Sequence, residues 1–253
     1  MRLALIPPNC MHQSILDGTI NLILPWQLKE LPTDFVQQAL KTYTILDNGA
    51  AEGHLTSWNE LTVLCQKYRP HEVVLPDALG DCETTREYVL QARPYIDALS
   101  DANSYTPSIM AVAQGQSLAE IMSCVNLYQE LPYINVIGLP RSMNQQFMKH
   151  SRLRMCESLN DIDDYTKPIH CLGSYYYEPA EMRDLKWIPI VRSMDTSLPW
   201  VYGWQGRWVD TRITTKKIDR PEDYFHVEYD TGQRSISERN VNICLRWAQT
   251  PRR

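Results

Sequence analysis

Several patterns that mark common classes of protein are missing from this sequence. No stretch of about 18 apolar residues occurs, so we expect no membrane-spanning segment. The apolar run within residues 1–8 is too short for a secretory signal and is expected to form a first buried strand. The GxSxG and phosphate-loop motifs are also absent, which leaves a serine hydrolase or an NTPase without support.

Metal-binding and disulfide patterns are missing as well. The seven cysteines form no CxxC pair, their number is odd, and the six histidines show no HxH or HxxxH spacing. We therefore expect free thiols, a reducing compartment and no structural zinc. A net basic charge is also lacking, since 25 Lys and Arg stand against 30 Asp and Glu. Most nucleic-acid binders are basic, but a local basic patch serves the same purpose, so net charge decides nothing here.

Eight short apolar or β-branched runs alternate with longer amphipathic segments. The runs are residues 2–6, 20–24, 43–46, 72–75, 109–113, 135–138, 169–172 and 188–192. Alternating strands and helices indicate an α/β protein with a parallel sheet and right-handed crossovers. Eight such units in 253 residues predict a single-domain (β/α)8 TIM-type barrel. An open doubly wound sheet is the alternative, disfavoured because no GxGxxG follows the first run.

The amphipathic segments predict the helices of the barrel. They are residues 31–42, 57–68, 82–98, 117–130, 143–159, 179–185 and 235–247. Ser57 with Glu60 and Ser117 with Glu120 are capping boxes at two helix starts. Residues 1–197 are expected to form the barrel core and residues 235–253 its closing helix. Residues 198–234, rich in Trp and Tyr with little helical period, predict an irregular or β-hairpin appendage.

Aspartates follow three of the predicted strands: Asp47 the third, Asp77 the fourth and Asp195 the eighth. Since the carboxyl ends of barrel strands form one mouth, these carboxylates are expected to converge. Such a group suits chemistry at an acetal-like carbon, where one carboxylate attacks or stabilises the carbon and another moves a proton. The alternative is that each forms a turn or caps a helix, which is the preferred interpretation for Asp81.

The order of these segments resembles the tRNA-guanine transglycosylase superfamily, and within it the phage and bacterial 7-deazaguanine DNA transglycosylases. Residues 45–50 (ILDNGA) resemble its LTDSGGF segment, 75–77 (LPD) its FDEC, 111–115 (AVAQG) its GIVQGG, 136–139 (VIGL) its AIGGL, and 169–173 (IHCLG) its LMGVG. Residues 192–196 (RSMDT) fall where the nucleophilic aspartate stands. The sequence departs from the pattern in Asn48 for serine, in Ala50 for the second glycine, and in lacking the CxCxxC…H zinc subdomain.

The resemblance implies an exchange of bases on a nucleic acid. Asp195 would be the nucleophile and Asp47 the general acid and base, and neither a cofactor nor a metal would be needed. The base-binding residues it implies are Asp77, Gln114, Asn48 and the backbone of Gly138. The incoming partner would be a 7-deazaguanine such as preQ0 or a derivative, and the missing zinc motif favours DNA over tRNA as the polymer.

Basic residues near the expected mouth are candidates for contacts with DNA phosphates. They are Arg141, Arg207, Arg212, Lys216, Lys217 and Arg220. The aromatic residues of 198–234 would stack on bases, or alternatively pack the end of the barrel. A basic helix around Lys149, Arg152 and Arg154 is a second candidate surface, or a solvated face.

Three other functions stay open at this point. The chain could be a tRNA-guanine transglycosylase, a DNA or nucleoside glycosidase in which water replaces the incoming base, or a non-catalytic nucleic-acid-binding barrel. The expected location is the cytoplasm, that of the host if a phage encodes the protein, where modified DNA would evade restriction. The sequence leaves the oligomeric state open.

Overall fold

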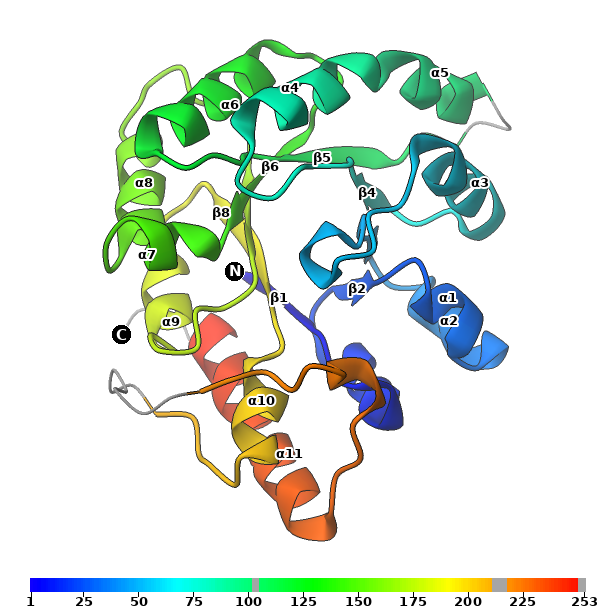
Figure 1. The fold of residues 1–253 in the computed structure, drawn as a ribbon, viewed down its shortest axis with the longest axis vertical. Coiled ribbons are helices and arrows are strands. Elements are labelled where there is room, and N and C mark those ends of the chain that lie inside the picture. The colour runs from blue at the N-terminus through cyan, green and yellow to red at the C-terminus, as the bar shows by residue number, and fades with distance from the viewer. Residues whose placement is uncertain (102–104, 211–217, 250–253) are drawn as a thin grey trace.

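The computed structural model describes residues 1–101, 105–210 and 218–249, and within them eight parallel strands form one sheet (Figure 1). The strands are β1 (Arg2–Leu5), β2 (Asn21–Ile23), β3 (Thr44–Leu46), β4 (Glu72–Val74), β5 (Ser108–Val112), β6 (Val136–Pro140), β7 (Ile169–Leu172) and β8 (Val191–Thr196). Their spatial order is β1-β8-β7-β6-β5-β4-β3-β2. A bridge between Ala4 and Ile20 brings β1 back towards β2, so the sheet is nearly closed. The predicted (β/α)8 barrel is thereby confirmed.

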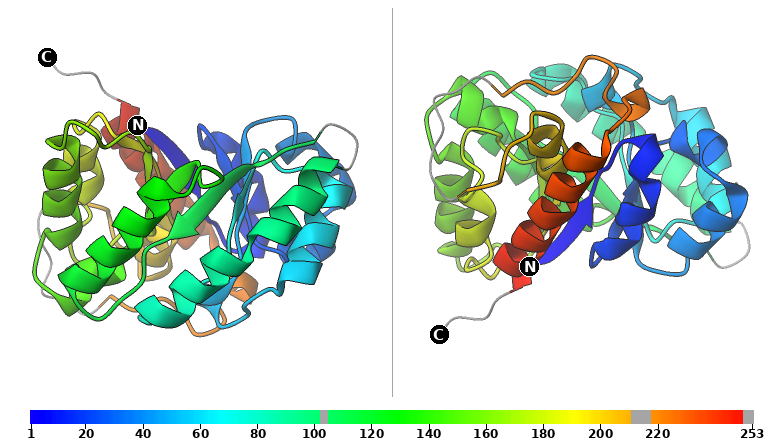
Figure 2. Two further views of the ribbon diagram at one scale, coloured as in Figure 1. Left: turned by 90° about the horizontal axis from the view of Figure 1, so that it is seen from above. Right: turned by 90° about the horizontal axis from the view of Figure 1, so that it is seen from below.

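Helices surround the strands on the outside (Figure 2). They are α1 (Gln27–Glu30), α2 (Thr33–Ala39), α3 (Trp58–Tyr68), α4 (Cys82–Gln91), α5 (Arg93–Asp101), α6 (Leu118–Glu130), α7 (Ser142–Gln146), α8 (Ser151–Asn160), α9 (Glu181–Leu185), α10 (Leu198–Trp204) and α11 (Thr231–Gln249). Three 3₁₀ segments, η1 (Asn9–Asp17), η2 (Ala50–Glu52) and η3 (Tyr224–His226), lie in the connections between these elements. Both predicted caps are confirmed, because the hydroxyls of Ser57 and Ser117 accept the backbone N–H three residues on.

Several predicted boundaries are wrong, and backbone chemistry explains two of them. The helix expected over 82–98 divides between α4 and α5, next to Pro94, which has no N–H for a helical bond. The strand expected at 188–192 begins only at Val191, since Pro189 cannot donate to a ladder. Asp195 is therefore inside β8 rather than after it. The helix expected over 143–159 divides near His150, whose φ is 61°, and residues 198–204 are helical rather than irregular.

The side chains inside the barrel form a separate small core. Alternation along the strands points Ala4, Ile20, Leu22, Ile45, Val74, Met110, Val112 and Val136 inwards, away from the larger core under the helices. Gly138 belongs to this interior, where an added Cβ would lie only 2.6 Å from Cδ1 of Leu172. Polar residues complete the interior on the side of β7 and β8, where His170 and Ser193 are both fully buried.

A buried ion pair crosses the amino end of the barrel from β8 to β4. Arg192 donates to both oxygens of Glu72 at 2.6 and 2.9 Å, and the Tyr43 hydroxyl donates to the same carboxylate at 2.6 Å. A shift in register between Ile169 and His170 marks a β-bulge in the pairing of β7 with β8, beside Arg192. Burial alone would raise the pKa of Glu72, but the bonds and charge of Arg192 outweigh it and lower that pKa below 4.5.

The Glu72→Gln variant is expected to lose about 3 kcal/mol of unfolding free energy at neutral pH, because the Arg192 charge would lose its partner in a mostly buried place. Since the folded-state pKa of Glu72 is lowered, the ion pair contributes fully above the unfolded pKa of about 4.5. The contribution disappears as the pH falls through the folded-state pKa. Urea unfolding at about pH 7 and about pH 3 measures both effects. Lys29→Gln, which breaks an exposed ion pair with Glu60, is the control and should cost far less; equal losses would contradict the prediction.

Candidate active site

A cavity of about 320 Å³ opens at the carboxyl end of the barrel. Each of the eight strands contributes to its wall, with residues that follow or end the strand. They are Ile6, Leu24, Asp47, Asp77, Gln114, Arg141, Gly173 and, in β8, Asp195. Leu22, Val112 and Leu172 add an apolar surface on which a flat ring could lie. The structure thus brings together the three aspartates that the sequence placed at strand ends.

Asp195 is held rigidly at this mouth. The backbone N–H of Gly173 donates to both carboxylate oxygens at 3.0 Å, and His170 Nε2 lies 3.0 Å from Oδ1. Gly173 has a φ of 66°, a conformation that suits glycine. The side chain of Asp195 is buried but lines the cavity. Oδ2 has one hydrogen-bond partner where Oδ1 has two, so Oδ2 retains more capacity to bind a ligand.

Asp47 stands at the same cavity in a different electrostatic environment. Burial raises its pKa from 3.8 to about 7, and the neighbouring charges of Asp195, Asp77 and Glu52 act in the same direction. The backbone N–H of Asn48 works against this rise without cancelling it. A carboxyl group with a pKa near neutrality can both donate and accept a proton, which is the requirement for a general acid and base.

Asp77 is fixed by two amides. Asn48 Nδ2 donates to Oδ1 and Gln114 Nε2 donates to Oδ2, each at 2.5 Å, and Gly80 N–H donates to Gln114 Oε1. Burial raises the pKa of Asp77, and the two amide bonds oppose the rise. Asn48 also donates to the Leu75 carbonyl and accepts from Ala50 N–H. Its amide is therefore engaged on both sides, and in this structure Asn48 positions Asp77 as well as lining the cavity.

Gly138 is not brought to the cavity. It lies inside β6, its carbonyl accepts the Ala113 N–H at 2.9 Å, and the cavity wall at the end of this strand is made by Pro140 and Arg141 instead. The close contact with Leu172 gives a packing reason for glycine at this position.

The basic residues that the sequence suggests for contacts with DNA lie in different places. Arg141 and Arg220 line the cavity; Arg141 lies over the Tyr176 ring, and Arg220 pairs through both nitrogens with Glu52. Arg207 lies over the ring of Tyr202, outside the cavity wall. The remaining three, Arg212, Lys216 and Lys217, lie outside the described residues.

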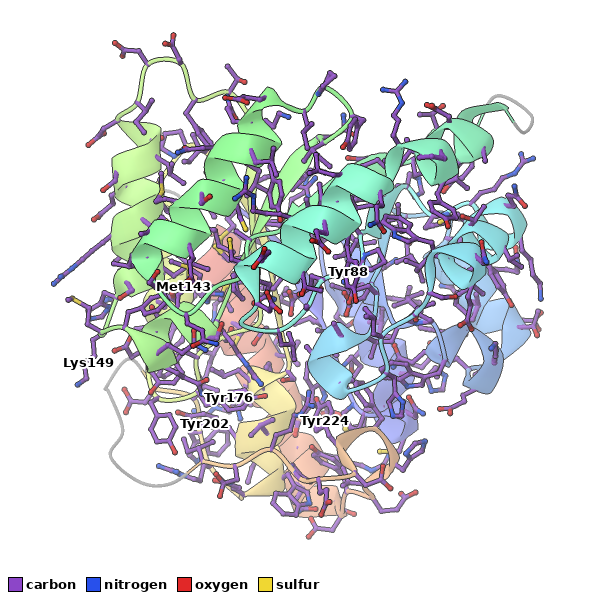
Figure 3. All side chains as sticks on the ribbon, turned by 45° about the horizontal axis from the view of Figure 1, so that its top comes forward. Tyr88, Met143, Lys149, Tyr176, Tyr202 and Tyr224 are labelled. Carbon is purple, nitrogen blue, oxygen red and sulfur yellow. The ribbon has the colours of Figure 1, made fainter. Side chains whose placement is uncertain are left out.

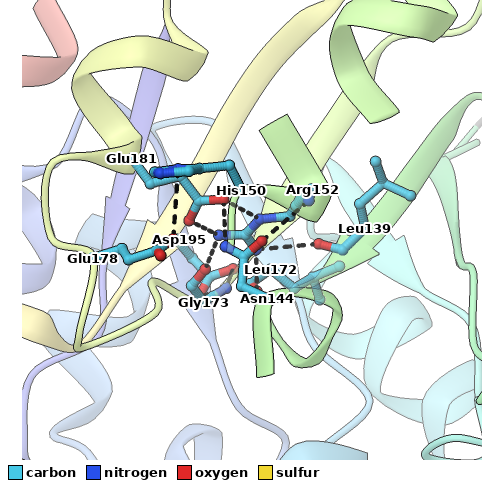
Figure 4. A network of polar contacts seen from close by, with 9 residues as sticks. All are labelled: Leu139, Asn144, His150, Arg152, Leu172, Gly173, Glu178, Glu181 and Asp195. Atoms are coloured by element: carbon cyan, nitrogen blue, oxygen red, sulfur yellow. Dashed lines mark hydrogen bonds and ion pairs between the residues drawn. The ribbon is translucent and has the colours of Figure 1, made fainter. Parts of the chain in front are cut away.

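Arg152, a member of the second basic candidate surface, is fully buried, so its expected contact with nucleic acid is wrong. It pairs with Glu181 at 3.0 and 2.6 Å and donates to the carbonyls of Leu139, Leu172 and Gly173 (Figure 4). These bonds hold the loop whose Gly173 N–H binds Asp195. In sequence, an arginine that packs inward looks the same as one on the surface. The sequence therefore does not reveal that Arg152 supports this loop.

The aromatic residues after β8 mostly pack the end of the barrel. Trp200, Tyr202, Tyr224, Phe225 and Tyr229 are buried, and Figure 3 shows Tyr202 and Tyr224 near Tyr176. Trp204 is half-buried, and Trp208 has 48% of its surface exposed, with the Arg239 guanidinium 4.1 Å from its ring centre. The packing alternative therefore describes most of these side chains, and Trp208 keeps a surface for stacking.

His170 contacts Asp195, but the sequence did not single it out as a site residue. Isolated histidines carry no pairing signal, and the useful clue was its position in the strand, two residues before Leu172 on the inward side.

Among the described residues, no three His, Cys, Asp or Glu side chains are grouped so as to hold a metal ion. No helix in the same part of the chain is long and apolar enough to cross a membrane. No protein-family model and no curated protein matches the sequence.

Asp47→Asn is expected to stabilise the protein at about pH 8. The folded-state pKa of about 7 lies above the ordinary 3.8, so the stability of the native protein falls as the pH rises between these values. A neutral amide removes this penalty, and one pKa unit corresponds to about 1.4 kcal/mol, so we expect a gain of at least about 1 kcal/mol.

Thermal and urea unfolding between about pH 3 and pH 9 measures the difference, which should disappear below about pH 4. Asp81→Asn is the matched control, because Asp81 caps α4 outside the cavity and asparagine caps equally well. A gain that is absent, or independent of pH, would contradict the assigned pKa of Asp47.

Proposed function

We propose that the protein exchanges a guanine in DNA for a 7-deazaguanine base, through a covalent intermediate on Asp195. The observation that carries this proposal is the division of labour among three aspartates at one cavity. Asp195 is held by hydrogen bonds that leave Oδ2 with one partner, burial raises the pKa of Asp47 to about 7, and Asp77 is held by amides. The resemblance to transglycosylases assigns the same three roles to the same three residues.

The first half of the reaction forms a glycosyl ester. A lone pair on Asp195 Oδ2 forms a bond to C1′ of the deoxyribose while the bond from C1′ to the base nitrogen breaks. The electron pair of the broken bond leaves with the base, and protonated Asp47 supplies the proton that makes the released guanine neutral. Because one ester-like bond replaces one glycosidic bond, the sugar stays bound to the protein while bases exchange.

The second half reverses these steps with a different base. The ring nitrogen of the 7-deazaguanine attacks C1′, the bond from C1′ to Oδ2 breaks, and its electron pair returns to Asp195. The proton lost by the incoming base goes to Asp47, which restores the starting state. The same group acts first as acid and then as base, which requires the near-neutral pKa of Asp47.

Base recognition is supported by the chemistry around Asp77. Guanine and 7-deazaguanines share N–H donors on one edge, and a carboxylate fixed by Asn48 and Gln114 is an acceptor for them. The apolar side chains of Leu22, Val112 and Leu172 offer a surface to the ring faces. A base paired in duplex DNA must first leave its stack to reach this cavity. Arg141 and Arg220 at the rim are the candidates for its flanking phosphates.

The test combines base exchange with trapping of the intermediate. Labelled guanine is expected to enter guanine-containing DNA, and a denaturing gel should show a protein–DNA adduct. Asp195→Ala should abolish both, and Asp47→Asn should slow exchange by roughly 10²- to 10⁴-fold, the usual contribution of acid–base catalysis. Asp81→Asn, which removes a carboxylate outside the cavity, should retain the native rate of exchange.

The products separate the competing functions. Abasic sites in DNA in place of exchanged bases would establish a glycosidase. Incorporation of labelled guanine into tRNA but not into DNA would show that tRNA is the substrate. An adduct that persists in Asp195→Ala would refute the assigned nucleophile. Binding of DNA without any exchange would leave a non-catalytic barrel.

A further inference from the structure

A chain of polar side chains runs through the barrel beneath the nucleophile. It starts at the Arg192–Glu72 ion pair, continues from Arg192 Nε to Ser193 Oγ at 3.0 Å, and from Ser193 Oγ to His170 Nδ1 at 2.8 Å. It ends where His170 Nε2 meets Asp195 Oδ1 at 3.0 Å. His170 and Ser193 are fully buried and do not line the cavity. The chemistry at C1′ uses only the last member, Asp195.

The two ends of this chain indicate the tautomer of His170. A carboxylate can only accept, so the hydrogen between His170 Nε2 and Asp195 Oδ1 belongs to Nε2. In a neutral imidazole Nδ1 then has no hydrogen and accepts from the hydroxyl of Ser193. A guanidinium can only donate, so Ser193 Oγ accepts from Arg192 and its own hydrogen is available for Nδ1.

We infer that His170 is a positioning residue for Asp195, holding Oδ1 with a neutral N–H so that Oδ2 alone attacks and leaves C1′. The inference rests on the proposed function for its chemical consequence and on the hydrogen-bond chain for its geometry. A neutral donor orients the carboxylate without cancelling its negative charge, which an imidazolium would do. The same bond to Oδ1 persists in the glycosyl ester, where Oδ1 is the carbonyl oxygen.

The position of Arg192 explains why the chain has a fixed direction. Glu72 holds the guanidinium through two nitrogens, so Nε remains free to face Ser193. Ser193 and His170 are directly paired across β7 and β8, and the bulge beside Arg192 separates this pair from Ile169 and Val191. The amino end of the barrel thereby determines how a side chain at its mouth is held.

The first experiment reads the tautomer without reference to activity. In ¹⁵N-labelled protein, long-range ¹H–¹⁵N correlation spectra distinguish the two ring nitrogens, and His170→Gln identifies the signal among the six histidines. We expect Nε2 to be protonated and Nδ1 to be a bare acceptor at neutral pH. Ser193→Ala should weaken this preference because Nδ1 would lose its donor. A doubly protonated ring, or a hydrogen on Nδ1, would overturn the inference.

The second experiment reads the chemical consequence. His170→Leu should slow adduct formation by roughly 10- to 100-fold, the range expected for a lost hydrogen bond to a charged group. The KM for DNA should stay within about 2-fold, since the bond acts on the nucleophile and not on DNA binding. His170→Gln, which retains an N–H donor, should recover most of the rate. Ile169→Val, on the outward side of the same strand, is the control for packing.

The outcomes separate this inference from the proposed function. If native protein exchanges bases and His170→Leu does so at an undiminished rate, His170 is not a positioning residue and the function stands. If the Nε2–H tautomer is found but no exchange occurs, the contact stands and the proposed function is wrong. If His170→Leu does not fold, the spectrum of the native protein and the rates of Ser193→Ala and His170→Gln still decide the matter.

Discussion

The ion pair between Arg192 and Glu72 is the constraint on which the interior of this barrel depends. It joins β8 and β4, which lie across the barrel from each other, at the end of the barrel remote from the cavity. Taking both charges out of water is costly, and only close two-point geometry with a further bond from Tyr43 compensates for it. Once Arg192 is fixed, its remaining N–H orients Ser193, and through it His170 and Asp195.

A second ion pair, which is fully buried, supports the opposite side of Asp195. Arg152 and Glu181 lie under the loop after β7, and three backbone carbonyls bind the same guanidinium. That loop supplies the Gly173 N–H that contacts both oxygens of Asp195. Side chains of three aspartates would repel one another in an open, mobile mouth. Two independent arginines, Arg152 fully buried and Arg192 mostly buried, hold the structure around them in one geometry.

The cavity also shows one residue type in three different environments. Asp195 accepts three hydrogen bonds, Asp77 is bound by two amides, and Asp47 lies half-buried beside their charges. Burial favours the protonated form, and the backbone N–H of Asn48 opposes it only in part, so the pKa of Asp47 rises to about 7. A carboxyl group that titrates near neutrality and a carboxylate fixed by hydrogen bonds therefore arise from the same side chain, through differences in their neighbours alone.

The sequence by itself determined the fold class, the positions of seven of the eight strands, two helix caps and the meeting of Asp47, Asp77 and Asp195. These follow from local patterns, because periodicity, capping residues and strand ends are properties of neighbouring residues. Only the tertiary structure decided that Arg152 faces inward, that Gly138 does not line the cavity, and that His170 contacts Asp195. Each of these depends on pairs far apart in the chain, such as Glu72 and Arg192, whose approach no local pattern encodes. Closure of the barrel brings such pairs together and so sets the burial and charge that distinguish one aspartate from another.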